Sequence, residues 1–180
     1  MLTRNQNSFL IFLPAKDFNE EEYSIVRNLL LKSGKEIFIT SDDHTVCSGS
    51  KGLKVKSDIS FNNVNTNNFA GIILIGGEGS RLYWNNSHLH NIVNEFFNSE
   101  KIVAAICSAT VILAKAGILK NKSATCFSED KMELINSGIN YNDRNVVFDG
   151  NVITADGPKS AIQFTEAILH TLKQKMKKVI

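Results

Sequence analysis

Residues 101–117, KIVAAICSATVILAKAG, constrain the fold more than any other stretch of the chain. The apolar run Ile102–Ile106 is typical of a strand that is buried on both faces. It passes without a turn residue into a helical pattern over residues 109–116, and Gly117 is a suitable C-cap for that helix. A buried strand followed at once by a helix predicts a parallel α/β sheet with Cys107 at its edge.

Cys107 lies at this junction between the small residues Ala105 and Ser108. A sharp strand-to-helix turn tolerates only small neighbours and pushes its central residue out over the sheet, which is the geometry of a nucleophile elbow. The unpaired N–H groups at the helix start favour a thiolate and can hold an oxyanion. We therefore interpret Cys107 as a functional thiol; the alternative is a buried cysteine acting as a small hydrophobe.

The rest of the chain alternates apolar runs with amphipathic helical patterns, as a doubly wound α/β domain does. Asp149-Gly150 between two apolar runs predicts a hairpin, and the polar segment 42–68 predicts a small hairpin or loop excursion. We expect strands at 8–13, 36–40, 69–75 and 123–127, and helices from residue 17 or 19 to Ser33-Gly34 and at 88–97, 130–137 and 160–175.

Composition supports one domain spanning residues 1–180, because 180 residues with 43% hydrophobic content can build a full core. A net charge of +2 gives no reason to expect a nucleic-acid or membrane partner. Three cysteines and no apolar leader favour the reducing cytoplasm. The GGEG sequence at 76–79 lacks the spacing of a nucleotide-binding fingerprint, and His88 and His90 lie on different helix faces. We therefore expect neither a cofactor nor a metal.

The chain resembles the ThiJ/PfpI family of the class I glutamine-amidotransferase-like superfamily. The resemblance is carried by GG after the third strand, AAIC at the elbow, AGILKNKSAT beyond it, and DGNVITADGP before the closing helix. It implies a single flavodoxin-like domain, a doubly wound and mostly parallel sheet with helices on both faces and a small hairpin. It also implies a homodimer or larger homo-oligomer and a reactive elbow cysteine, here Cys107. The resemblance also implies an oxyanion pocket at the GG pair, Gly76 and Gly77. The backbone of Gly77 and the backbone of Ser108 form this pocket.

Two positions depart from the family pattern. The family places a Glu after the first strand, where its carboxyl group contacts the thiol; an alignment without gaps puts Asn19 there, with Glu20 next to it. We expect one of these two to contact Cys107, and we expect Glu21 and Glu22 to be a solvated helix start. Peptidase-like members have a His directly after the Cys, where this chain has Ser108, so a Cys–His dyad would need a His from another subunit.

Three functions remain open from the sequence. The first is glyoxalase- or deglycase-like chemistry on small reactive carbonyls, in which Cys107 adds to an aldehyde. The second is a non-catalytic redox-sensing or chaperone-like stress protein. The third is a PfpI-like cysteine peptidase or amidase. Cys126 falls near the expected position of the Cys107 thiol and is a candidate redox partner, although a buried strand cysteine is the simpler interpretation.

Overall fold

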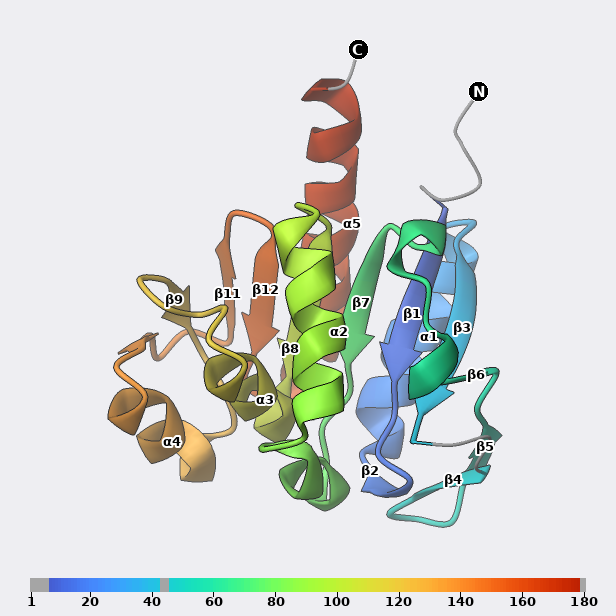
Figure 1. Ribbon diagram of the computed structural model, residues 1–180, viewed down its shortest axis with the longest axis horizontal. Helices are drawn as coiled ribbons and strands as arrows, with labels where there is room; N and C mark the ends of the chain where they lie inside the picture. Colours follow the sequence, from blue (N-terminus) through green and yellow to red (C-terminus); the bar gives the residue numbers. More distant parts are fainter. Residues whose placement is uncertain (1–6, 43–45, 179–180) are drawn as a thin grey trace.

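The computed structural model describes residues 7–42 and 46–178, and its centre is a mostly parallel sheet (Figure 1). The strand order is β11-β12-β8-β7-β1-β3-β6, and only β11 runs antiparallel to its neighbour. The apolar runs explain this order, because strands buried on both faces belong at the centre of a parallel sheet. The strands are β1 (Ser8–Phe12), β3 (Glu36–Ser41), β6 (Ile59–Ser60), β7 (Gly71–Leu74), β8 (Ile102–Ile106), β11 (Val146–Asp149) and β12 (Val152–Ala155).

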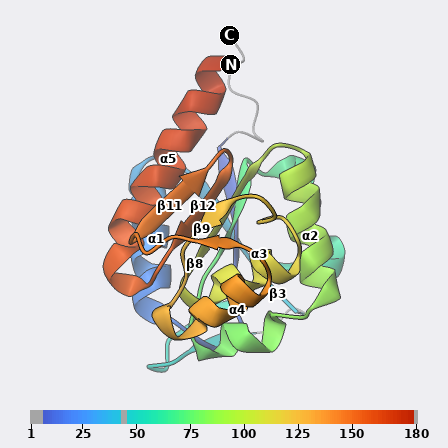
Figure 2. The same cartoon turned by 90° about the vertical axis from the view of Figure 1, so that its left-hand side faces the viewer.

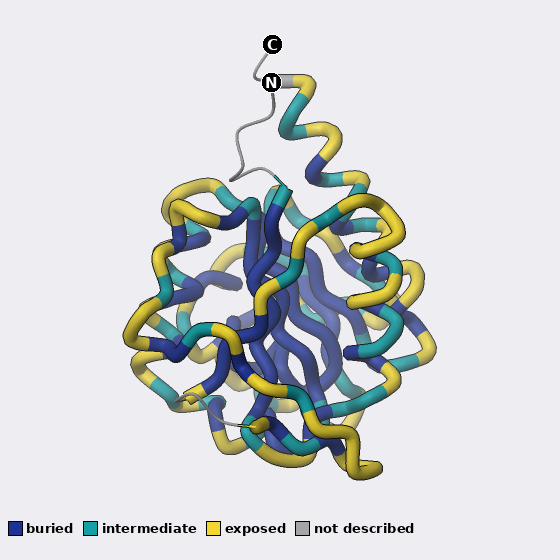
Figure 3. The backbone as a smooth tube through the Cα atoms, turned by 90° about the vertical axis from the view of Figure 1, so that its right-hand side faces the viewer, coloured by how far each residue is buried: buried dark blue, intermediate teal, exposed yellow. Residues whose placement is uncertain are grey.

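Helices cover both faces of the sheet, with α1 and α5 on one side and α2 on the other (Figure 2). Two separate apolar clusters fill the two interfaces, and the central strands contribute alternate residues to each. Figure 3 shows these strands as the buried interior and the surrounding loops as the exposed exterior. The helices are α1 (Glu20–Lys32), α2 (Ser87–Asn98), α3 (Thr110–Lys115), α4 (Lys131–Asn136) and α5 (Ala161–Lys178).

Two small sheets lie outside the central one. The excursion expected between residues 42 and 68 contains a short antiparallel pair, β4 and β5, and the chain before α1 adds a third strand, β2, to it. The run expected to be a strand at 123–127 is reduced to two residues that pair outside the main sheet. The bounds are β2 (Lys16–Phe18), β4 (Val46–Gly49), β5 (Lys54–Lys56), β9 (Ser123–Ala124) and β10 (Asn140–Tyr141).

This architecture confirms the expected mixed α/β class, the hairpin around Asp149-Gly150 and the strand-to-helix junction at Cys107. Phe164 and Ile168 of α5 face the core, whereas Ile162 in its first turn is exposed. No helix in the described part of the chain is long and apolar enough to cross a membrane.

Candidate active site

The elbow forms where β8 ends at Ile106 and the short 3-10 helix η5 (Cys107–Ala109) begins. Cys107 has a φ of 61°, a left-handed conformation that non-glycine residues adopt at an energetic cost. The surrounding core holds it there, since Ile106 and Ala109 are fully buried and Cys107 itself is 6% exposed. The sequence prediction of a sharp turn centred on Cys107 is thus confirmed in its geometry.

The glycine pair follows β7 at the same edge of the sheet. A Cβ atom on Gly76 would lie 2.6 Å from the Cβ atom of Cys107, so only glycine lets this strand end approach the elbow so closely. Gly77 has a φ of 110° and packs against the backbone leading into α1. The backbone N–H of Asn19 donates to the carbonyl of Gly76 at 2.9 Å, which fixes the start of α1 against the glycine pair.

Glu22 is the carboxyl group that α1 brings to this edge. It is fully buried, and its Oε2 atom accepts a hydrogen bond from the backbone N–H of Gly76 at 2.9 Å. Its other oxygen, Oε1, is buried without a well-formed hydrogen bond to any described residue. The polar side chain that interacts with this carboxyl is the Cys107 thiol.

Burial determines the protonation of both groups. It raises the pKa of Glu22 to about 7, against smaller lowering effects of the hydrogen bonds with Gly76 and Cys107. Burial and the negative charge of Glu22 raise the pKa of Cys107 to about 12, although the Ser108 N–H, directed at the sulfur, acts in the opposite direction. The expected thiolate stabilisation at the helix start is therefore outweighed, and near neutral pH the thiol keeps its proton next to a carboxyl that can accept it.

The structure places neither Asn19 nor Glu20 at the thiol, so this part of the predicted site was wrong. The side chain of Asn19 caps α1 and accepts hydrogen bonds from the N–H groups of Glu21 and Glu22, both at 3.1 Å. Glu20 turns toward the loop between β4 and β5, where its Oε1 accepts from the N–H groups of Lys51 and Leu53 at 2.7 and 2.9 Å.

Glu22 was expected to be solvated, and the spacing of residues along α1 only narrows the choice of the buried carboxyl. Glu22, Val26 and Leu30 are spaced four residues apart, which puts them on one face of a helix. All three are fully buried. Glu21 has the same spacing to Ile25 and Leu29 and is nevertheless exposed. The pattern therefore disfavours Glu20, whose face carries Ser24 and Asn28, but does not select Glu22 over Glu21.

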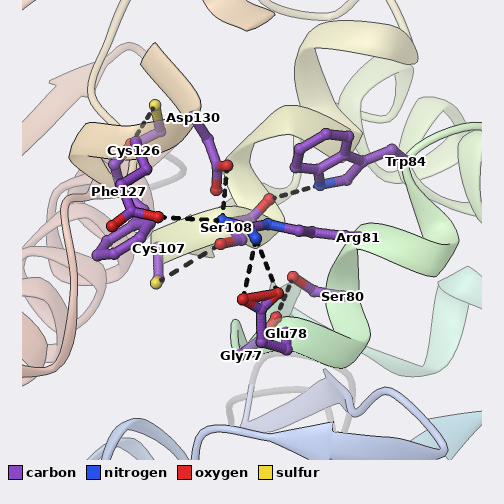
Figure 4. Close-up of polar contacts among 11 residues, drawn as sticks. Gly77, Glu78, Ser80, Arg81, Trp84, Cys107, Ser108, Cys126, Phe127 and Asp130 are labelled. Carbon is purple, nitrogen blue, oxygen red and sulfur yellow. Dashed lines mark hydrogen bonds and ion pairs between the residues drawn. The ribbon is translucent and has the colours of Figure 1, made fainter.

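Ser108 is held by a residue from the loop after the glycine pair. The indole Nε1 of Trp84 donates to the carbonyl of Ser108 at 2.9 Å (Figure 4). The carbonyl of Trp84 is in turn 2.8 Å from Nε2 of His90. The hydroxyl of Ser108 lies 3.9 Å from the Cys107 sulfur. The contact with Trp84 fixes the peptide between Ser108 and Ala109, and so restrains the backbone of Ser108, whose own N–H faces the sulfur.

Cys126 does not face Cys107. Its thiol donates to the carbonyl of Phe127 at 3.3 Å, and Figure 4 shows the two sulfur atoms pointing apart. The two cysteines belong to different core clusters on opposite faces of the sheet, and both are free. A disulfide between them would require backbone movement, so the geometry gives no support to the redox pair considered from the sequence.

The described histidines lie away from the thiol. His90 contacts the carbonyl of Trp84, His88 lies against the ring of Phe61, and His170 is exposed on α5. His44 lies outside the described residues. Within residues 7–42 and 46–178 there is also no cluster of three His, Cys, Asp or Glu side chains that could hold a metal ion.

Comparison with known proteins agrees with this geometry. A sequence model of the DJ-1/PfpI family matches residues 8–171. Deglycase PfpI of Pyrococcus furiosus is 31% identical over 91% of this chain and 99% of its own length. The glutathione-independent glyoxalase DJR-1.2 of Caenorhabditis elegans is 28% identical over 93% of this chain and 90% of its own length. The crystal structure of a ThiJ/PfpI domain protein from Brachyspira murdochii superposes with a TM-score of 0.92 at 29% identity, covering 94% of this chain and 98% of that one.

Proposed function

Because the chain belongs to the DJ-1/PfpI family, we propose that it is a cysteine-dependent enzyme that converts small reactive carbonyls without an added thiol cofactor. The observation that carries the proposal is the buried pair of Glu22 and Cys107, which meets at Gly76 next to backbone N–H groups. The names of two relatives, a deglycase and a glyoxalase, favour the same chemistry.

The first step is the addition of the thiol to an aldehyde carbon. The Cys107 sulfur forms the new C–S bond, its proton passes to the Glu22 carboxylate, and the carbonyl electron pair moves to oxygen. In this proposal the N–H groups of Gly77 and Ser108 stabilise that oxyanion, which then takes the proton from Glu22 to give a hemithioacetal. The elevated pKa of Glu22, about 7, suits a group that must accept and return a proton near neutral pH.

A 2-oxoaldehyde such as methylglyoxal allows the reaction to be completed. Transfer of hydrogen from the former aldehyde carbon to the neighbouring carbon converts the hemithioacetal to a 2-hydroxy thioester, with no net gain or loss of electrons. Hydrolysis by water then releases lactate and restores the thiol. Methylglyoxal plus water therefore yields lactate, and neither a metal nor a redox cofactor enters the balance.

The test is the production of lactate from methylglyoxal in the absence of glutathione. We expect turnover by the wild type, its loss in Cys107→Ala, and a decrease of about a hundredfold or more in Glu22→Gln, because general acid–base catalysis contributes about that much. Glu21→Gln and Cys126→Ser are matched controls that should retain activity. A wild type without lactate production, or a Glu22→Gln variant with full activity, would contradict the proposal.

A second candidate is a redox-sensing protein, and the Glu22 carboxyl beside the thiol favours it, because in its protonated form it can donate a hydrogen bond to an oxidised sulfur. A thiol with a pKa of about 12 carries little thiolate at neutral pH, so this oxidation would be slow. In this case one peroxide oxidises the thiolate to a sulfenate, a second gives the sulfinate, and each peroxide is reduced to water or hydroxide. Sulfinate at Cys107 by mass spectrometry, in a protein that makes no lactate, would favour this candidate.

The peptidase alternative has less support from the described residues. Acyl transfer needs a base for the leaving amine, and none of His88, His90 and His170 contacts the thiol. If the wild type hydrolyses a fluorogenic peptide and Cys107→Ala does not, the peptidase function would be supported.

A further inference from the structure

A cluster of charged side chains lies beside the elbow, formed by Glu78, Arg81, Glu129 and Asp130 and called here the Arg81 cluster. Both Nη atoms of Arg81 are engaged: Nη1 contacts the two carboxylate oxygens of Glu78 at 2.9 and 2.8 Å, and Nη2 contacts Asp130 Oδ1 at 2.9 Å. Glu129 approaches Nη2 at 3.9 Å. Three carboxylates around one guanidinium leave the cluster with an excess of two negative charges.

This excess is not compensated within the described part of the chain, where no other basic side chain forms an ion pair with these carboxylates. Asp130 is 5% exposed, and its second oxygen, Oδ2, is buried without a hydrogen-bond partner. Glu78 and Glu129 have side chains that are 72% and 73% exposed, so their charge faces the solvent from which a substrate arrives. Arg81 is therefore already neutralised and is not free to bind a substrate carboxylate.

The cluster is placed at the candidate active site by the glycine pair. Glu78 follows Gly77 directly and opens the 3-10 helix η4 (Glu78–Tyr83), which packs against the elbow helix η5. Figure 4 shows the guanidinium of Arg81 beside Ser108, with Glu78 on one side and Asp130 on the other. Glu129 and Asp130 come from a separate element, the 3-10 helix η6 (Ser128–Asp130), so two parts of the chain converge on this side of the elbow.

We propose that the Arg81 cluster makes Cys107 selective for uncharged carbonyl compounds, such as 2-oxoaldehydes, over compounds that carry a carboxylate, such as 2-oxoacids. This inference deepens the proposed function by assigning a charge preference to its substrates. The mechanism is electrostatic repulsion of an approaching anion by the two uncompensated charges, combined with the engagement of both Nη atoms of Arg81 by carboxylates.

The test compares two alkylating reagents of nearly identical size at Cys107, neutral iodoacetamide and anionic iodoacetate. Both react with the same thiolate, so the ratio of their rate constants is independent of the pKa of the thiol. Labelling at Cys107 is followed by peptide mass spectrometry, which separates it from Cys47 and Cys126. We expect the ratio for wild-type Cys107 to exceed the ratio for glutathione in the same buffer.

Charge removal should lower this ratio in steps. Glu78→Gln and Glu129→Gln should each lower the iodoacetamide-to-iodoacetate ratio about twofold, and the double variant about fourfold, because each removes one nearby charge at the surface. Glu100→Gln is the matched control, since Glu100 is exposed just before the start of β8, at the opposite edge of the sheet. A concentration of 1 M NaCl should bring the wild-type ratio close to that of the double variant.

An unchanged ratio in the double variant, or a change equal to that in Glu100→Gln, would overturn the inference. So would the failure of both reagents to label Cys107. The proposed function is tested separately, by lactate production. If the iodoacetamide-to-iodoacetate ratio depends on these charges but the protein makes no lactate, the catalytic proposal is contradicted and the charge selectivity of Cys107 is still supported. If turnover occurs, glyoxylate, which can add to the thiol but has no ketone carbon to become a 2-hydroxy acid, should inhibit lactate production more strongly in the double variant than in the wild type.

Discussion

Glu22 and Cys107 meet at Gly76, where the carboxyl group of the first accepts the Gly76 N–H at 2.9 Å and interacts with the thiol of the second. A single Cβ atom on Gly76 would lie 2.6 Å from the Cβ atom of Cys107 and 2.9 Å from Oε2 of Glu22. Three segments distant in the sequence, after β7, in α1 and after β8, thus share one small buried space. The proposed chemistry and the predictions below depend on this contact.

The buried carboxyl of Glu22 should make folding stability depend on pH. Below pH 4.5 both the folded and the unfolded state hold the proton, whereas between pH 4.5 and 7 the unfolded state releases it and the folded state keeps it. Stability should therefore fall as the pH rises through this window, by about 3 kcal/mol at most. Urea unfolding of wild type and Glu22→Gln from pH 4 to 8 should show a smaller fall in the variant. If stability fell equally with pH in the wild type and in Glu22→Gln, the assigned effect of burial on Glu22 would be contradicted. The control variant Glu21→Gln should show the same pH dependence as the wild type.

Gly76→Ala should destabilise the protein and damage the site together. The new methyl group would meet the carbonyl of Ile106 at 2.8 Å as well as Cys107 and Glu22, and backbone atoms cannot yield cheaply. We expect a loss of about 1–3 kcal/mol in the free energy of unfolding, the cost of overpacking. Gly157→Ala is the control, because a Cβ atom there would meet nothing within 4 Å. Equal stability of the two variants would refute this account of the close approach.

Asn19→Ala separates helix capping from catalysis. The substitution removes the side-chain acceptor for the N–H groups of Glu21 and Glu22, so the free energy of unfolding should drop by about 1 kcal/mol. Asn19→Asp should preserve the cap and the stability. Neither variant should alter the pH dependence of Cys107 alkylation. A shift of the alkylation midpoint in Asn19→Ala, in a protein that remains folded, would show that Asn19 does act on the thiol.

Trp84→Phe should loosen the backbone of Ser108, the residue that follows the nucleophile. The variant keeps an aromatic ring and loses the indole N–H that donates to the carbonyl of Ser108 at 2.9 Å. We expect a stability loss of about 1 kcal/mol and a shift of Cys107 alkylation to higher pH, because the Ser108 N–H that favours the thiolate is less well oriented. If the alkylation profile of the variant is identical to that of the wild type, Trp84 contributes packing but does not influence the Ser108 N–H.

The sequence contained enough to predict the elbow but not the partner of its thiol. A fully apolar strand, small residues around Cys107 and an immediate helix leave little choice of geometry, and the strand, turn and burial follow. The partner depends on where α1 begins and which way it faces. The short strand β2, with Asp17 at a φ of 55°, leaves no recognisable pattern in the sequence, and an ungapped alignment therefore selected Asn19.

The acidic run at the start of α1 shows why the helix dipole could not settle this choice. Glu20, Glu21 and Glu22 suit the first turn equally well, yet one binds loop N–H groups, one is exposed and one is buried at the thiol. Residue spacing separates only Glu20 from the other two, because Glu21 precedes Ile25 and Leu29 in the same way as Glu22 precedes Val26 and Leu30. The orientations of Cys126 and Arg81 depend on packing between elements far apart in the sequence, which residue patterns do not encode.

The most direct test of the central claim is the pH dependence of Cys107 alkylation by iodoacetamide in wild type, Glu22→Gln and Glu20→Gln. Because the charge of Glu22 raises the pKa of Cys107, Glu22→Gln should move the alkylation midpoint to lower pH and speed alkylation at neutral pH, while lactate production falls. Glu20→Gln should leave the midpoint unchanged. A midpoint indifferent to Glu22→Gln, or one that moves with Glu20→Gln instead, would contradict the account.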